Sequence, residues 1–368
     1  MVKIGPKRSV GGIGMNNTAA KRGVSLVCLA VGIALFAWAL VMDFSRSGIS
    51  YRGAVLVLGV VSVIVGLYLF PTQKHHKTII NILFLFPLLF AFVVTVILPL
   101  FLGLFYSFTD WNGIEYKQVI GIANYAKMFK QPSFIWSILV TALFVVANMI
   151  LVNLVAFLLA LLCTSKIKGM SFFRASYFLP NLIGGIVLGY IWQFIFANVV
   201  TLLTTAISDN RISMLANTNT AFMAIVVVYI WQYAGYIMLI YIAGLNTVPA
   251  EVLEAAAIDG ADPMQTLFNV KIPMIAPTIT ICTFLTLTSA FKQFDVNLAL
   301  TNGTGAVANF MGSFLSNGTQ MLALNIYDTA ITENNYSFAQ AKAFLFFLIL
   351  AAVSILQVRI SNKKEVEL

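Results

Sequence analysis

The sequence predicts an all-α polytopic membrane protein with about eight transmembrane helices. The chain has 368 residues, of which 60% are hydrophobic and only 10% are charged. Soluble domains carry about 25% charged residues, so a soluble core could not hide this much apolar surface. The apolar residues also gather into runs of the length that a helix needs to cross a bilayer, about 20 residues. Lipid is therefore the expected solvent of this chain.

We place the spans on the longest apolar runs. They are expected at residues 23–42, 53–70, 79–107, 134–164, 178–199, 221–245, 274–300 and 341–360. Three of them exceed one bilayer crossing, which predicts tilt or protrusion into water. A basic tail at 1–22 precedes two N-terminal helices within 23–78, and a short tail at 361–368 closes the chain.

The distribution of lysine and arginine predicts the orientation. These residues collect in cytoplasmic loops, and an even number of spans puts most of the basic loops on one side. Both termini are therefore expected in the cytoplasm, in a multi-pass protein of the cell membrane. The first apolar run ends in Ala37-Trp38-Ala39 and could be a cleaved signal, but its length favours an uncleaved anchor. The net charge of +9 is scattered over short loops, unlike a nucleic-acid footprint.

Few residues could carry metal or covalent chemistry. Cys28, Cys163 and Cys282 each lie inside an apolar run without a paired spacing, and His75 and His76 are the only histidines. We predict neither a disulfide framework nor a metal site. The sequence also contains no GxxxxGK[ST] phosphate loop and no GxSxG nucleophile motif. Hydrolysis of ATP by this chain is not expected.

A polar segment at 251–273 interrupts the apolar sequence between the sixth and seventh spans, on the expected cytoplasmic side. Glu251 favours a helix N-terminus, and Gly260 can end that helix in a left-handed conformation. Asp262 can cap a second helix whose first residue is Pro263. Two short helices are predicted. They either connect two spans along the membrane surface or dock into a groove of a cytoplasmic partner.

The order of residues in this segment resembles the EAA loop of binding-protein-dependent ABC importer permeases. Glu254-Ala255-Ala256 is followed by Asp259-Gly260-Ala261 and by Pro273, with the spacing of that loop. Further matches to carbohydrate importers of the maltose and multiple-sugar type are FYSFTDWNG from Phe105, KGMSFFRASYFLPNLI from Lys168 and LALTNGTG from Leu298. The resemblance covers residues 79–360 and implies a six-helix ABC importer permease core. The two N-terminal helices resemble those of larger maltose-type permease subunits.

The resemblance implies a division of labour. Residues 247–275 would form a coupling loop held in a groove of a separate ATP-hydrolysing subunit. The residues assigned to coupling are Glu254, Ala255, Ala256, Asp259 and Gly260. The implied partners are a second related permease, two ATP-binding subunits and an extracytoplasmic solute-binding protein. ATP and Mg would be bound by the ATPase subunits, with no cofactor in this chain, which would be a transport subunit and not an enzyme.

Polar side chains within the spans indicate where a substrate could bind, because they are costly in lipid and usually face the interior of the bundle. The positions that match the pocket of maltose-type permeases are Asn181, Gln232, Tyr233, Tyr236, Thr286 and Gln293. Trp192 and Gln193 are weaker candidates. Lys292 and Asp295 are three residues apart in the seventh predicted span and could pair on one helix face.

The prediction is a permease subunit of an ATP-driven ABC importer that moves a carbohydrate, an oligosaccharide, by alternating access. One alternative is an ABC permease for another solute, such as glycerol phosphate or a peptide. A secondary transporter is a second alternative, disfavoured because no clear pair of inverted repeats with interrupted helices is visible. A membrane enzyme is disfavoured because no catalytic constellation is apparent.

Overall fold

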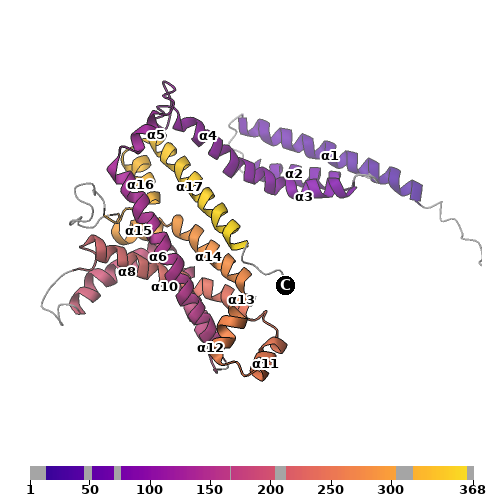
Figure 1. The fold of residues 1–368 in the computed structure, drawn as a ribbon. Helices are drawn as coiled ribbons and strands as arrows, with labels where there is room; N and C mark the ends of the chain where they lie inside the picture. The colour runs from indigo at the N-terminus through magenta and orange to yellow at the C-terminus, as the bar shows by residue number, and fades with distance from the viewer. Residues whose placement is uncertain are drawn as a thin grey trace, which may run out of the picture. The chain divides into compact units, whose positions relative to one another are not determined.

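The computed structural model describes residues 14–44, 52–69, 76–165, 167–203, 213–303 and 318–362. These residues form helices joined by turns, with an isolated antiparallel bridge between Thr109 and Val119. The predicted all-α fold class is confirmed. Residues 1–13 and 363–368 of the predicted tails lie outside the described part of the chain. Contacts divide the chain into unit 1, Met1–Phe101, and unit 2, Leu102–Leu368, and each unit is described by itself (Figure 1).

Unit 1 is built on a close pair of antiparallel helices. Its elements are α1 (Gly14–Phe44), α2 (Arg52–Leu69), α3 (His76–Phe92) and the π-helical turn η1 (Val93–Ile97). Between α1 and α2, a Cβ on Gly32 would stand 2.7 Å from the backbone nitrogen of Val63. The hydroxyl of Ser62 donates to the carbonyl of Cys28 at 2.9 Å. Small residues thus let the backbones of α1 and α2 come into contact. Such close packing is common between membrane helices, because lipid is as apolar as the side chains and the hydrophobic effect does not drive the helices together.

Unit 2 contains the longer helices. After α4 (Leu98–Ser107), which crosses the boundary between the units, its elements are α5 (Ala123–Met128), α6 (Pro132–Cys163), α7 (Met170–Phe178), η2 (Leu179–Leu182), α8 (Gly185–Phe194), η3 (Ile195–Val200), α10 (Thr218–Leu245), α11 (Ala250–Ile258), α12 (Pro263–Gln265), η4 (Thr266–Lys271), α13 (Ile272–Met274), α14 (Ala276–Phe291), α15 (Asp295–Thr301), α16 (Leu322–Tyr327), η6 (Asp328–Thr332) and α17 (Tyr336–Asn362). In Figure 1, α11 and α12 lie at one end of this unit and α5 and α16 at the other.

Helix α10 is the centre of unit 2. In its most apolar stretch 56% of the residues are buried, against 28% in α6 and 17% in the span that begins with α8. It packs against α6 and α14, and α15 packs against α8. Tyr229 of α10 contacts Phe144 of α6 edge to face, with ring centroids 5.1 Å apart. The lipid-facing helices therefore surround one helix that has protein on most sides.

The number of full-length spans in the described residues is smaller than predicted. Five stretches are long and apolar enough to cross a membrane, namely Phe84–Ser107, Pro132–Cys163, Gly185–Leu203, Thr218–Leu245 and Tyr336–Ile360. Pro263–Met274 and Ala276–Phe291, bent by 72°, make a sixth if they count as one span. The first two predicted spans correspond to shorter apolar stretches, Gly23–Ala39 and Gly53–Leu69. The prediction of a multi-pass membrane protein is confirmed, and the described residues contain five or six helices long and apolar enough to cross a bilayer.

Two predicted spans are interrupted, and the prediction of continuous helices was wrong there. Within 178–199, the 3₁₀ turn η2 follows α7 and a new helix begins only at Gly185. Pro180 explains this break, because proline lacks a backbone donor and crowds the preceding turn. Within 274–300, α14 ends at Phe291 and α15 begins at Asp295. In a continuous helix, the side chains of residues 292–295 would point to several sides and would place charge against lipid. The break lets these side chains line one pocket.

Candidate functional site

The polar loop (residues 247–275) folds as two short helical segments joined at Gly260. Helix α11 ends in a pair of hydrogen bonds, from the nitrogen of Ala261 to the carbonyl of Ala256 at 3.0 Å and from Gly260 to Ala257 at 3.2 Å. This is a Schellman cap, which needs a left-handed residue, and Gly260 has φ +76°. The left-handed helix end predicted at Gly260 is confirmed.

The second segment of the polar loop starts at a capping box. The Asp262 carboxylate accepts from the backbone nitrogen of Gln265 at 2.7 Å, and the Gln265 side chain accepts from the Asp262 nitrogen at 2.9 Å. Pro263 occupies the first helical position, where its missing donor costs nothing. The helix continues through η4 and α13 and then bends into α14. The predicted cap and first position are both confirmed.

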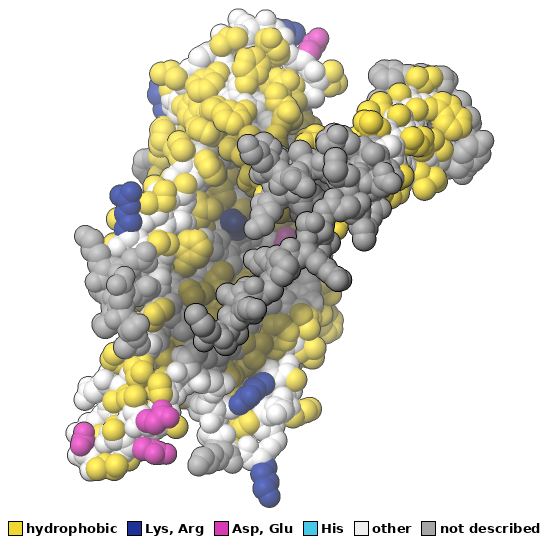
Figure 2. Space-filling model, turned by 90° about the vertical axis from the view of Figure 1, so that its right-hand side faces the viewer, with side chains coloured by type: hydrophobic (Ala, Val, Ile, Leu, Met, Phe, Trp, Pro, Cys, Tyr) yellow, Lys and Arg dark blue, Asp and Glu magenta, His cyan; other side chains and the backbone are white. Residues whose placement is uncertain are grey.

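The polar loop is exposed over most of its length. Glu254 and Asp259 are both exposed, and Ile258 retains 85% and Met264 63% of their possible exposure. Figure 2 shows acidic side chains gathered at the lower end of the view, where Figure 1 places α11 and α12. A surface that combines carboxylates with large apolar side chains suits an ionic and hydrophobic contact with another protein.

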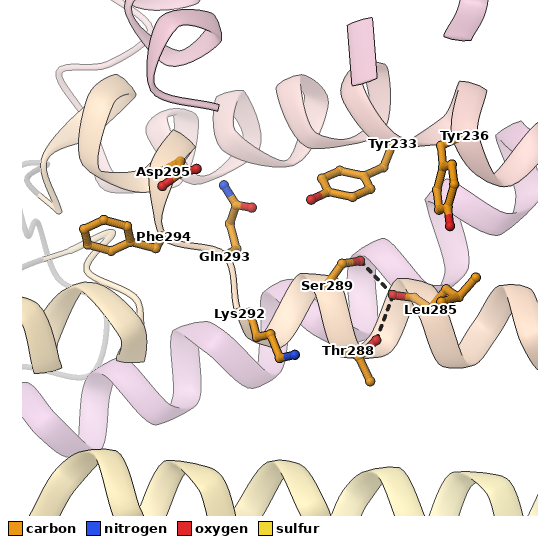
Figure 3. Close-up of a pocket in the computed structure, with 9 residues that line it drawn as sticks. All are labelled: Tyr233, Tyr236, Leu285, Thr288, Ser289, Lys292, Gln293, Phe294 and Asp295. Atoms are coloured by element: carbon orange, nitrogen blue, oxygen red, sulfur yellow. Dashed lines mark hydrogen bonds between the residues drawn. The ribbon is translucent and has the colours of Figure 1, made fainter. Parts of the chain in front are cut away.

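A pocket of about 400 Å³ lies beside the break between α14 and α15 (Figure 3). It is lined by side chains of α10, of α14 and of the connection between α14 and α15. The lining residues are Tyr233, Tyr236, Leu285, Thr288, Ser289, Lys292, Gln293, Phe294 and Asp295. Its size falls within the roughly 300–1,000 Å³ of small-molecule sites. It joins three aromatic rings to amide, hydroxyl and charged groups.

Several lining groups are held in place by neighbours. The Ser289 hydroxyl lies 2.8 Å from the phenol oxygen of Tyr229 and also donates to the carbonyl of Leu285 at 2.8 Å. The Tyr229 ring stacks on Tyr233 with centroids 4.4 Å apart. The wall formed by α10 and α14 is therefore fixed before any ligand arrives, which lowers the entropic cost of binding.

Gln293 is the most unusual member of the lining. Its side chain is only 6% exposed, and its amide nitrogen has no hydrogen-bond partner among the described residues. In Figure 3 the amide oxygen of Gln293 is turned toward Tyr233, and its amide nitrogen lies on the side of Asp295. An unpaired buried donor costs roughly 1–3 kcal/mol. A ligand that accepts from this nitrogen would remove that cost.

Three of the six predicted substrate residues line this pocket, namely Tyr233, Tyr236 and Gln293. The other three lie elsewhere. Gln232 is buried and donates to the carbonyl of Ile183 at 3.4 Å, across the break before α8. Asn181 is half-buried in the turn η2. The substrate role of these residues stays a prediction.

Thr286 lies in a helix contact and not in the pocket lining. It is 1% exposed, donates to the carbonyl of Cys282 at 2.9 Å and accepts from the amide of Asn153 at 3.3 Å. The Asn153 oxygen in turn accepts from the hydroxyl of Tyr241 at 3.0 Å. This chain of bonds joins α6, α10 and α14, so Thr286 is placed as a link between helices.

Lys292 and Asp295 line the pocket, whereas the sequence suggested that they pair with each other. They belong to different helices, because Lys292 is the C-cap of α14 and Asp295 is the first residue of α15. No ion pair joins them in the described part of the chain, and Figure 3 shows the lysine directed along α14, away from Asp295. The signal that could have revealed the break was the density of polar residues at 292–295, since charges within a span are costly unless they face a cavity.

Metal binding finds no support in this part of the molecule. Among the residues that the structure describes, no group of three or more histidine, cysteine or acidic side chains gathers closely enough to hold an ion. Cys163 and Cys282 are buried free thiols. The candidate sites are thus the pocket and the polar loop.

The fold and these two sites define a multi-pass membrane protein with a polar pocket between its helices and an exposed loop at one end of unit 2. The family model of the binding-protein-dependent transport system inner membrane component matches residues 169–366. The chain is 42% identical over 287 residues to the probable starch degradation products transport system permease protein AmyD of Thermoanaerobacterium thermosulfurigenes, which covers 78% of this chain and 95% of that protein. The chain belongs to this family of transport permeases.

Two further likenesses agree with that membership. The multiple sugar-binding transport system permease protein MsmF of Streptococcus mutans is 33% identical over 277 residues, covering 74% of this chain and 92% of that protein. A crystal structure of a bacterial ABC transporter involved in the import of the acidic polysaccharide alginate shares the fold. Its TM-score is 0.68 at 18% identity, and the match covers 79% of this chain and 98% of that one. The family membership favours a transport subunit over the secondary transporter and the membrane enzyme.

Proposed function

We propose that this chain is a permease subunit of an ATP-driven importer and that it carries a carbohydrate through the pocket beside the α14–α15 break. The observation that carries the proposal is the lining itself. Tyr233, Tyr236 and Phe294 offer ring faces, and Gln293 offers a buried donor that has no partner among the residues described. Sugars have apolar ring faces and many hydroxyl groups, so they can stack and form hydrogen bonds in such a space. The relatives named for starch degradation products and for multiple sugars support the same solute class.

The polar loop is the proposed contact with the ATP-hydrolysing subunit. Glu254 and Asp259 would make ionic contacts there, and Ala255 and Ala256 keep α11 narrow enough to enter a groove. Gly260 would let the two segments change their angle when the ATPases close. The 72° bend between the second segment and α14 links this movement to the helix that lines the pocket. Closure of the ATPases would in this way reach the pocket through α14.

The remaining partners follow from the family. A second permease would complete the translocation path, and an extracytoplasmic binding protein would deliver the solute. Two ATP-binding subunits would hold ATP and Mg, so this chain needs no cofactor of its own. Both termini are proposed to lie in the cytoplasm, because the polar loop must face the ATPases on that side.

Affinity capture followed by reconstitution tests the proposal. The tagged chain is purified from its native membranes in mild detergent, and co-purifying proteins are identified by mass spectrometry. A second multi-span permease and a Walker-motif ATPase are expected. The captured complex is then reconstituted in proteoliposomes with its binding protein. It should transport labelled oligosaccharide only when ATP is supplied on the side of the membrane where the ATPase subunits lie. A chain that purifies only with itself, or uptake without ATP, would contradict the proposal.

Glycerol phosphate or another anionic solute is the second candidate, because the Lys292 ammonium lines the pocket. Unlabelled solutes in excess decide between the candidates. Competition by neutral sugars and none by glycerol phosphate favours the carbohydrate, and the reverse result favours the anion.

A further inference from the structure

The break between α14 and α15 places two opposite charges in the pocket lining, Lys292 and Asp295. Lys292 and Asp295 are exposed, and among the described residues neither has an ion pair or a side-chain hydrogen bond. Both residues follow the apolar helix α14. Charged side chains that line a cavity of a membrane-helix bundle mark a substrate path or a partner.

The surroundings of Asp295 show that its position is constrained. A Cβ on Gly185 of α8 would stand 2.7 Å from the Cβ of Asp295 and 3.1 Å from one carboxylate oxygen. Two residues further along α15, Asn297 is fully buried, and its amide donates to the carbonyl of Thr319 at 2.8 Å and accepts from the nitrogen of Met321 at 3.0 Å. Gly185 therefore leaves the space that the Asp295 side chain occupies, and the buried bonds of Asn297 fix the start of α15 beside the pocket.

We propose that Lys292 and Asp295 form a charge-balanced recognition pair that selects an uncharged carbohydrate over an acidic one. The inference rests on the proposed carbohydrate function and names the solute class within it. The Asp295 carboxylate accepts hydrogen bonds from sugar hydroxyls, the Lys292 ammonium donates to sugar oxygens, and Gln293 between them can do both. A neutral sugar satisfies all three groups without adding charge.

An acidic sugar fits this arrangement poorly. Its carboxylate would gain the attraction of Lys292 but meet the repulsion of Asp295, so the pair supplies no net attraction to offset the removal of that carboxylate from water. A pocket with the lysine alone would favour the acid. Asp295 is thus the residue that sets selectivity, and Lys292 contributes affinity for either class of sugar.

The test measures sugar binding to the pocket itself. The solute-binding protein is left out, because it would otherwise select the sugar before the sugar reached the pocket. The complete purified transporter, free of its binding protein, is examined by saturation-transfer NMR. The neutral probes are maltotriose, sucrose and raffinose, and the acidic probe is a trisaccharide of mannuronate. Wild type, Asp295→Asn, Lys292→Gln and the exposed-loop control Lys130→Gln are compared, and ATP-driven uptake of the best neutral probe is measured in parallel.

Wild type should bind a neutral probe and reject the mannuronate trisaccharide. Loss of a charged hydrogen-bonding group is expected to weaken neutral-probe binding roughly 10- to 100-fold in Asp295→Asn and in Lys292→Gln. Asp295→Asn alone should gain binding of the acidic probe, which a merely structural role would not produce. Lys130→Gln should match wild type.

Three results would overturn the inference. The first is a preference of wild type for the acidic probe, and the second is binding of neutral sugar by both variants as tight as that of wild type. The third is loss of a subunit of the complex in Lys292→Gln, which would assign the lysine to a subunit contact. A transporter that binds no carbohydrate of either kind contradicts the proposed function itself, and this outcome is distinct from the other three.

Discussion

The polar loop and the pocket differ in how their structure is specified. The polar loop is exposed and held by bonds between near neighbours, such as the capping box of Asp262 and Gln265 and the Schellman cap at Gly260. The pocket is assembled from α10, α14 and the start of α15, and its supports come from far along the chain. The bond from Asn297 to the carbonyl of Thr319 is one of them. A local motif can be recognised in a sequence, whereas a pocket wall depends on the packing of distant helices.

This contrast explains how far the sequence could predict the molecule. The two segments of the polar loop, the left-handed glycine and the cap of the second segment follow from residue types at fixed spacing. For the pocket, Tyr233, Tyr236 and Gln293 were placed by their likeness to a family, while Thr286 turned out to belong to a helix contact. Residue spacing alone does not show which face of a span meets its neighbours.

The interrupted spans were missed for a related reason. The apolar runs gave no sign that 178–199 and 274–300 contain breaks, because hydropathy averages over a window and does not register one lost turn. Pro180 was visible in the sequence, as was the polar group at 292–295. Each favours a break, but proline and polar residues also occur in unbroken membrane helices.

The largest expected effect comes from Gly235→Ala in the helix packing behind the pocket. A Cβ at Gly235 would collide with the backbone carbonyl of Tyr177. A backbone carbonyl cannot move aside as a flexible side chain can, so α10 and α7 must separate. We expect the loss of folding free energy to lie at the upper end of the roughly 1–3 kcal/mol that overpacking costs. We expect a loss of folded protein in detergent and a Tm lower by several degrees. Gly184→Ala is the matched control, because its Cβ would meet nothing within 4 Å, and a normal yield of Gly235→Ala would disprove the packing account.

Asn297→Ala should have the next largest effect and would sharpen the contrast. It removes the bonds to the carbonyl of Thr319 and to the nitrogen of Met321, and loss of the second bond leaves a buried backbone donor unsatisfied, which costs roughly 1–3 kcal/mol. Because α15 begins the pocket wall, sugar uptake should fall together with thermal stability. The exposed Asn198→Ala, which loses only a bond to Phe194 within its own helix, serves as the comparison. Loss of stability with unchanged uptake would separate α15 from the pocket.

Gly260→Ala should act locally. The new side chain has open space around it, so its cost is the left-handed backbone alone, about 1–2 kcal/mol. The Tm of the spans should stay near wild type, while ATP hydrolysis that depends on the binding protein should fall. Gly184→Ala is again the control. A fall in Tm as large as that of Gly235→Ala would mean that the polar loop is packed and not free.

The smallest expected effect concerns pH and a second exposed loop, which follows α4. The backbone N–H of Gln118 donates to the Asp110 carboxylate and lowers the pKa of this group; burial opposes the shift, and the N–H of Lys117 adds to it. A pKa lower in the folded than in the unfolded state gives stability that is present above the ordinary value of about 4 and is lost as pH falls through the folded value. The rate at which pepsin cleaves this loop in wild type, divided by the rate in Asp110→Asn so that the pH dependence of pepsin itself cancels, should therefore rise as pH drops below about 4. A ratio that does not change with pH would contradict the role of Asp110.

The central claim is that the pocket carries the solute and the polar loop carries the signal from ATP. The most direct measurement is the number of sugar molecules taken up per ATP hydrolysed by the reconstituted transporter, for Gln293→Ala and Glu254→Ala beside wild type. The account predicts that Gln293→Ala keeps binding-protein-stimulated ATP hydrolysis and loses most uptake, whereas Glu254→Ala loses stimulated hydrolysis, or the ATPase subunit itself, with its spans still folded. Normal uptake per ATP in Gln293→Ala, or normal assembly and transport in Glu254→Ala, would contradict it.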